Sequence, residues 1–298
     1  MSGAQYTIIG LGELLWDLLP SGEQLGGAPA NFAYTSTMLG DRGIVVSRAG
    51  KDALGGKALD RLQQAGLTTA HVQVDGQHPT GTVAVQLGEQ GKPSFVITED
   101  VAWDFLEWSP DLQALAERAD AICFGSLAQR SPQSRATIQR FVKAARRNTL
   151  TFFDVNLRAP FYSAAVMTES LKLARVVKLN DEEVERVMTL CGLRGVDEID
   201  CARRLLRTYD LDMVCVTRGE RGSLLLTAVE SFEHQGFSTD VVDTVGAGDA
   251  FSAAVMHHYL RGASLERMSD AANRLGAWVA AQSGAMPAAD ASVLGEIV

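Results

Sequence analysis

The chain has 298 residues, 46% of them hydrophobic, and a formal net charge of −9. Its length suits one large α/β domain. The acidic balance argues against a protein that binds nucleic acid or an anionic membrane surface, because both partners attract clustered Lys and Arg. No apolar run is long enough to span a bilayer, no charged leader precedes the first apolar run, and the four cysteines lack C-x-x-C spacing. We therefore expect a cytoplasmic protein without disulfides.

Short apolar runs alternate with helical patterns along most of the sequence. The expected strands are YTIIGLG (6–12), GIVVSRAG (43–50), DAICFGS (120–126), LTFFDVN (150–156), VVKLN (176–180) and DMVCVTRG (212–219). The expected helices between them include 31–39, 56–65, 133–147 and 201–209. Such alternation predicts βαβ units and hence an α/β fold with a mainly parallel sheet covered by helices on both faces. Ligands of such sheets bind beyond the carboxyl ends of the strands.

Two stretches, about 13–25 and 80–100, interrupt this alternation. In the second, Thr82–Leu87 and Pro93–Thr98 flank Gly88–Gly91, which is a hairpin signal. We expect these stretches to form a small antiparallel β flap that acts as a lid, the alternative being an edge hairpin without a role. A lid over a site would exclude water. No repeat or linker marks a second unit, so residues 1–298 are expected to form a single domain.

The most informative run is D-T-V-G-A-G-D-A-F, residues 243–251. Gly246, Ala247 and Gly248 are small residues placed where an apolar run passes into a helix, so backbone amides there can approach an anion. Asp249 stands inside this anion hole. A carboxylate beside a phosphate is costly unless it has work to do, such as accepting a proton from an attacking hydroxyl. A glycine-rich helix start with Asp249 as a first-turn charge is the simpler alternative.

Three further segments place polar side chains at expected strand or helix ends. Gly26–Ala33 sets paired glycines and an Asn before a helix, Asp154–Arg158 ends a buried strand with an Arg suited to an anion, and Asn180–Glu183 is close to a capping box. Each segment also has a purely structural interpretation, respectively a loop-to-helix junction, a surface ion pair and the start of a helix.

Together these runs resemble the signatures of the PfkB family of carbohydrate kinases, which have the ribokinase-like fold. D-T-V-G-A-G-D-A-F matches the C-terminal signature, while G-G-A-P-A-N-F-A and the upstream G-E-L-L-W-D-L-L-P resemble the fructokinase branch in particular. The resemblance spans residues 12–285 in the expected order. It implies ATP-dependent transfer of the γ-phosphate to a primary hydroxyl of a monosaccharide.

The substrate that the resemblance favours is fructose, which would give fructose 6-phosphate. 2-Keto-3-deoxygluconate and ribose are the alternatives, and a keto acid would need a cation such as Arg48, Arg130 or Arg158 for its carboxylate. A function of another class also stays open, namely a sugar- or nucleotide-binding regulator without turnover. A homodimer formed through the lid is common in relatives and is expected here on that ground alone.

The resemblance also implies roles for individual residues. Asp249 is the implied catalytic base, with Gly246, Ala247 and Gly248 as the anion hole. The implied sugar-binding residues are Asp17, Gly27, Asn31 and Arg158. The implied nucleotide-binding residues are Thr217, Gly219 and Gly222 of a T-x-G-x-x-G turn, together with Asn273 in the adenine pocket.

Metal ions are implied in the same way. Asn180 and Glu183 match an N-x-x-E element that arranges Mg2+ and its waters beside the phosphates of ATP, a setting that suits a hard cation. Asp243, with Ser283–Ala285, matches the monovalent-cation site that many relatives carry, where the expected ion is K+.

Overall fold

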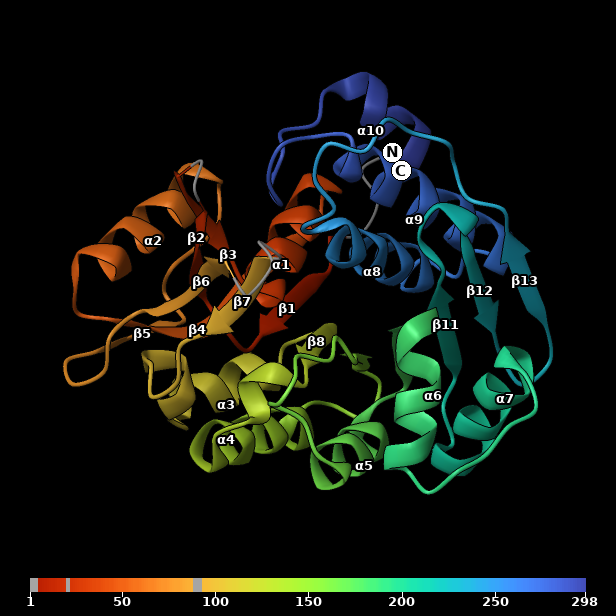
Figure 1. The fold of residues 1–298 in the computed structure, drawn as a ribbon, viewed down its shortest axis with the longest axis horizontal. Coiled ribbons are helices and arrows are strands. Elements are labelled where there is room, and N and C mark those ends of the chain that lie inside the picture. The colour runs from red at the N-terminus through yellow and green to blue at the C-terminus, as the bar shows by residue number, and fades with distance from the viewer. Residues whose placement is uncertain (1–4, 20–21, 88–92) are drawn as a thin grey trace.

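Nine strands form the central sheet of the protein, in the order β13-β12-β11-β10-β9-β8-β1-β4-β5, in a computed structural model that describes residues 5–19, 22–87 and 93–298 (Figure 1). Every pair from β5 to β11 is parallel, and β11–β12 and β12–β13 are antiparallel. The strands are β1 (Thr7–Leu11), β4 (Arg42–Gly50), β5 (Val72–Asp75), β8 (Ala121–Gly125), β9 (Leu150–Asp154), β10 (Val176–Asn180), β11 (Met213–Thr217), β12 (Ser223–Leu226) and β13 (Ser231–His234). The predicted mainly parallel sheet is confirmed.

Helices cover both faces of this sheet (Figure 1). One hydrophobic cluster joins the sheet to α3–α7, and a second joins it to α1, α8, α9 and α10. The helices are α1 (Ala28–Met38), α2 (Ala53–Gln64), α3 (Pro110–Ala116), α4 (Pro132–Ala144), α5 (Ala164–Leu173), α6 (Asp181–Leu190), α7 (Glu198–Tyr209), α8 (Ala247–Tyr259), α9 (Leu265–Ala280) and α10 (Ala291–Ile297). In the part of the chain described, no helix is long and apolar enough to cross a membrane.

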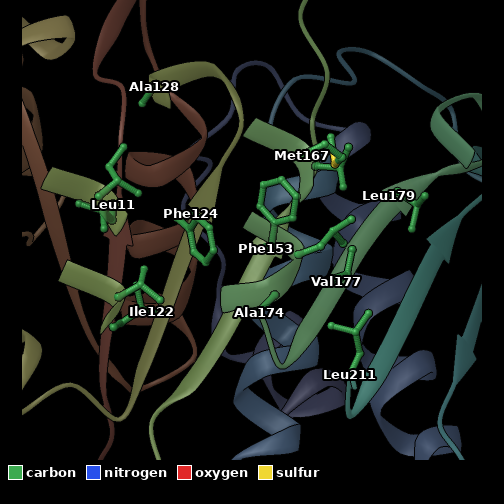
Figure 2. Close-up of a cluster of buried hydrophobic side chains, with 14 of the residues drawn as sticks. Leu11, Ile122, Phe124, Ala128, Phe153, Met167, Ala174, Val177, Leu179 and Leu211 are labelled. Atoms are coloured by element: carbon green, nitrogen blue, oxygen red, sulfur yellow. The ribbon is translucent and has the colours of Figure 1, made fainter. Parts of the chain in front are cut away.

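The strand interiors read as continuous apolar runs because both faces are buried. Figure 2 shows side chains of β1, β8, β9 and β10 meeting in one layer of the first cluster. Phe124 and Phe153 stack there with ring centroids 5.3 Å apart. On the other face α1 lies so close to β4 that a Cβ added at Gly43 would collide with the carbonyl oxygen of Ala33. This packing fixes the carboxyl ends of the strands relative to α1 and α8.

The predicted lid is a separate four-stranded sheet in the order β3-β2-β6-β7. Its strands are β2 (Leu15–Leu19), β3 (Gly22–Gly26), β6 (Gly81–Leu87) and β7 (Pro93–Ile97). Two of its pairs are antiparallel as predicted, but β2 and β6 run parallel, because a long connection through β4 and α2 separates them. The predicted turn at Gly88–Gly91 lies outside the described residues.

Candidate active site

The start of α8 opens toward the carboxyl ends of the central strands. Gly246 is the N-cap residue, with φ +83°, and a Cβ there would lie 2.7 Å from that of Ala285, so both conformation and space require glycine. The amide of Ala247 donates to Thr244 O at 3.3 Å, and the first helical bond runs from Ala250 N to Gly246 O at 2.8 Å. The amides of Gly248 and Asp249 are therefore the ones this helix start offers to an anion.

Asp249 meets Asn31 across the site. Asn31 Nδ2 donates to Asp249 Oδ2 at 2.8 Å, although the two residues are 218 positions apart. Burial and, to a lesser extent, the nearby charge of Asp154 raise the pKa of Asp249 to about 6, although Asn31 and Lys178 act in the opposite direction. The structure thus brings together the predicted base and one predicted sugar ligand, and it gives the base a pKa suited to exchanging a proton near neutral pH.

Asp17 approaches the same space from β2 of the lid. A Cβ added at Gly26 would lie 2.5 Å from Asp17 Oδ2, so glycine at that position lets the carboxylate pack against β3. Burial raises the pKa of Asp17 to about 6; the guanidinium of Arg158 lowers it and Asp243 raises it. Arg158 itself is exposed after β9, and its charge also acts on Asp249. Arg158 therefore links the two desolvated carboxylates, because its charge acts on both Asp17 and Asp249.

Gly27 joins these groups to α1. It is the N-cap residue of that helix, with φ +109°, and a Cβ there would lie 2.5 Å from Glu13 O. Only glycine fits at position 27, because the Glu13 backbone approaches so closely. Since the helix begins directly after Gly27, Asn31 lies one turn into it.

Glu13 is a buried residue of the site that the sequence did not predict. Its side chain is 3% exposed, and Oε2 is buried without a hydrogen-bond partner in the part of the chain described. Burial raises the pKa of Glu13 to about 7, the charge of Asp249 adds to this, and backbone amides of Glu13 and Ala28 oppose it. The Gly-Glu pair directly after the first strand could have indicated this residue, because a carboxylate at the end of a buried strand does not contribute to apolar packing.

The capping box at Asn180 is confirmed. Asn180 Oδ1 accepts from Glu183 N at 2.8 Å, and Glu183 Oε2 accepts from Asn180 N at 2.9 Å. Glu183 Oε1 accepts a further bond from Leu157 N at 2.7 Å. Both carboxylate oxygens are thus engaged by amides. Within the described residues no group of three His, Cys, Asp or Glu side chains could hold a metal. Asn180 and Glu183 would therefore hold Mg2+ through water molecules, with phosphate oxygens as its direct ligands.

The T-x-G-x-x-G segment forms the turn between β11 and β12. Thr217 ends β11, Gly219 and Gly222 have φ of +59° and +82°, and a Cβ at Gly222 would collide with His234 O. Asn273 lies on α9 and is buried, where its Nδ2 donates to Ser223 Oγ and to Ser269 O, each at 2.8 Å. Asn273 therefore ties α9 to β12 directly behind this turn.

Asp243 holds two loops together beside α8. Its Oδ1 accepts from Val245 N at 3.0 Å and its Oδ2 from Gly284 N at 3.2 Å. The predicted monovalent-cation residues Asp243 and Ser283–Ala285 are thus adjacent. The other arginines weighed for an anionic substrate are engaged elsewhere, Arg48 with Asp75 at 2.9 Å and Arg130 with Asp104 at 2.7 Å. Arg158 is the one of the three that faces the site carboxylates.

A cradle of amides, an adjoining carboxylate of raised pKa and a lid carrying a second carboxylate define a phosphotransferase that acts on a hydroxyl compound. Comparison with known proteins agrees, since the model of the pfkB family carbohydrate kinases matches residues 22–291. The chain belongs to this family and is a carbohydrate kinase.

Three relatives show how far the likeness extends. The chain is 30% identical over 299 residues to a fructokinase of Escherichia coli, covering 93% of this chain and 94% of that one. It is 25% identical to the Vibrio cholerae fructokinase solved with fructose, ADP and calcium, with a TM-score of 0.82 and 100% of both chains covered. The ATP-bound fructokinase of Xylella fastidiosa shares the fold, with a TM-score of 0.87 at 23% identity, covering 99% of this chain and 98% of that one.

Proposed function

We propose that this kinase transfers the γ-phosphate of ATP to the primary hydroxyl of fructose, giving fructose 6-phosphate. The observation that carries the proposal is the pairing of Asn31 with Asp249 at 2.8 Å, beside the free amides of α8 and opposite Asp17 on the lid. Fructokinases are prominent among the relatives, which favours fructose over other sugars.

In the proposed reaction, Asp17, Asn31 and the backbone at Gly27 hold the sugar hydroxyls. Asp249 accepts the proton of the primary hydroxyl while the hydroxyl oxygen attacks the γ-phosphorus. The bond between the γ-phosphorus and the β-phosphate oxygen breaks, and ADP leaves. The transition state of phosphoryl transfer is loose, so a weak base that is well positioned suffices. Amides of Gly248 and Asp249, with Arg158, stabilise charge on the phosphoryl oxygens.

The other components are proposed on the same basis. ATP lies along Thr217–Gly222 with its phosphates toward the start of α8. Asn180 and Glu183 would hold Mg2+ through water, where the ion would neutralise phosphate charge, and Asp243 with Ser283–Ala285 would hold K+. Because Arg158 is exposed and faces the site carboxylates, 2-keto-3-deoxygluconate is the second candidate substrate.

The test is ADP release from MgATP with fructose, ribose, 2-keto-3-deoxygluconate or glucose, with and without K+. A preference for fructose by tenfold or more in kcat/KM supports the proposal, whereas preference for another sugar replaces the substrate. Asp249→Asn should abolish turnover and still bind sugar. Binding without turnover in the unaltered protein would indicate a regulator.

A further inference from the structure

A buried lysine lies directly beneath the proposed phosphate cradle. Lys178 is on β10, is 7% exposed, and places Nζ 3.1 Å and 3.3 Å from the two carboxylate oxygens of Asp154 at the end of β9. Ser252 of α8 joins this pair, because its Oγ lies 2.9 Å from Asp154 Oδ2 and 3.0 Å from Gly248 O. One buried polar group therefore connects β9, β10 and the first turn of α8.

The contact with α8 explains why residue 248 is glycine. A Cβ added at Gly248 would lie 3.0 Å from Lys178 Nζ and 3.9 Å from its Cε. The first separation is tighter than ordinary van der Waals contact, and the second is ordinary. The φ of Gly248 is not among the positive ones, so what restricts residue 248 is the space that Lys178 occupies and not the backbone conformation. The ammonium group thus lies beside Gly248, in the first turn of the helix whose amides would meet the phosphates.

The charges around Lys178 show that it compensates for carboxylates of the site. Burial alone would lower the pKa of Lys178, but the carboxylates of Asp154, Glu183 and Asp249 together raise it above the ordinary value. The lysine is therefore a fixed cation at neutral pH. It lies among groups of negative charge, so removing its charge would leave these carboxylates facing one another in a poorly solvated place.

We propose that Lys178 is a positioning residue for phosphoryl transfer, whose buried ammonium group holds the start of α8 against β9 and β10 and supplies a fixed positive charge beside Asp249. The kinetic part of this inference rests on the proposed function. The packing part, in which Lys178 supports the cradle through Gly248, does not.

The kinetic test compares K178M with K172M, in which the replaced lysine is exposed on α5 and paired with Glu169. We expect K178M to lower kcat by about tenfold or more, as loss of preorganised charge does, with a smaller change in the KM for sugar. K172M should match the unaltered enzyme. The groups that act on Asp249 are Asp154, Lys178, Arg158, Asn31 and, from the other side, Glu13. Because K178M removes a cation, the acid limb of kcat/KM against pH should move to higher pH.

The double variant K178M/D154N separates electrostatics from general damage. It removes both members of the buried ion pair, which proteins tolerate better than removal of one. The acid limb should then return toward that of the unaltered enzyme, since the cation and the anion act on Asp249 in opposite directions, while kcat stays low. Should K178M not fold, the double variant alone decides the matter, and full activity in it overturns the proposal.

A stability measurement tests the packing without any turnover. Met ends near the position of the lysine Cε, 3.9 Å from a Cβ at residue 248, so G248A should lower the urea midpoint in the unaltered protein and much less in K178M. Equal losses in both backgrounds would overturn the contact. If no sugar in the panel is phosphorylated, the proposed function fails, and MgATP affinity of K178M then tests the cradle. Unchanged affinity together with equal losses would refute the inference.

Discussion

Asp249→Asn should make the protein more stable at neutral pH while removing the base. Burial and the neighbouring charge of Asp154 raise the pKa of Asp249 from its ordinary 3.8 to about 6. The ionised carboxylate therefore destabilises the folded state. Asn has nearly the same shape, carries no charge, and its amide oxygen can still accept the bond from Asn31. The substitution therefore removes a repulsion and keeps a contact.

The size of the effect follows from linkage. A displacement from 3.8 to about 6 corresponds to about 3 kcal/mol. This is an upper bound, because Asp249 keeps some accessible surface and water screens part of the repulsion. We expect a gain of about 1–2 kcal/mol in the free energy of unfolding, or roughly 2–6 °C in Tm for a domain of this size.

The gain in stability on Asp249→Asn should depend on pH in one direction. A carboxyl group whose pKa is raised in the folded state destabilises fully above that pKa and not at all below its unfolded value. The gain of Asp249→Asn should therefore be complete above pH 6 and vanish toward pH 4. Urea unfolding followed by circular dichroism at pH 7.5 and pH 4.5 measures it, with the exposed Asp60→Asn on α2 as the control, expected to change little. A variant that is equally stable or less stable at pH 7.5 would refute the reasoning.

Four further predictions concern the site and its frame. Asp17→Asn should raise the KM for sugar about tenfold or more and leave that for ATP unchanged, as expected for a charged hydrogen bond; an unmoved KM places the sugar elsewhere. The kcat/KM of the unaltered enzyme should fall as the pH drops through about 6, because Asp249 is then protonated; a constant value down to pH 5 contradicts its role as base. Glu183→Ala removes the acceptor for the amides of Asn180 and Leu157 and should cost about 1–3 kcal/mol in urea unfolding, with more Mg2+ needed for half-maximal rate. Gly43→Ala, whose Cβ collides with Ala33 O, should be severely destabilising, whereas Gly56→Ala on α2, which meets nothing within 4 Å, should be neutral or stabilising; similar losses in both would mean that the close approach of α1 to β4 is not what matters.

The sequence was sufficient for those features that depend on local patterns. Alternating apolar runs predicted six parallel strands, and Asn180 with Glu183 predicted a capping box that the structure contains. Helix starts were less well predicted; α1 begins at Ala28 and not at residue 31, because Pro29 fits the first turn of a helix and Gly27 provides its N-cap. The parallel pairing of β2 with β6 could not be read from either strand, since it depends on the connection between them.

The candidate site shows the same division. Asp249, Asn31 and Asp17 carry recognisable motifs. The structure joins Asn31 to Asp249 by a hydrogen bond, and the charge of Arg158 acts on both Asp17 and Asp249. Glu13 and Lys178 stand among apolar residues in the sequence, where a single charged residue gives no periodic signal. What marks them is burial together with unpaired or opposite charge, which requires coordinates. A charged residue inside an otherwise apolar strand, as in Val176–Asn180, is the pattern that deserved a functional hypothesis.

The separation of 218 positions between Asn31 and Asp249 has a consequence for how the protein is made. A ribosome delivers the lid and α1 early, but the base and the phosphate cradle arrive only with the last sixth of the chain. An incomplete chain therefore holds the proposed sugar-binding groups without the proposed base and phosphate cradle. Nascent or prematurely terminated products that end before α8 cannot drain the nucleotide pool, because catalysis begins only when the two ends of the chain have met.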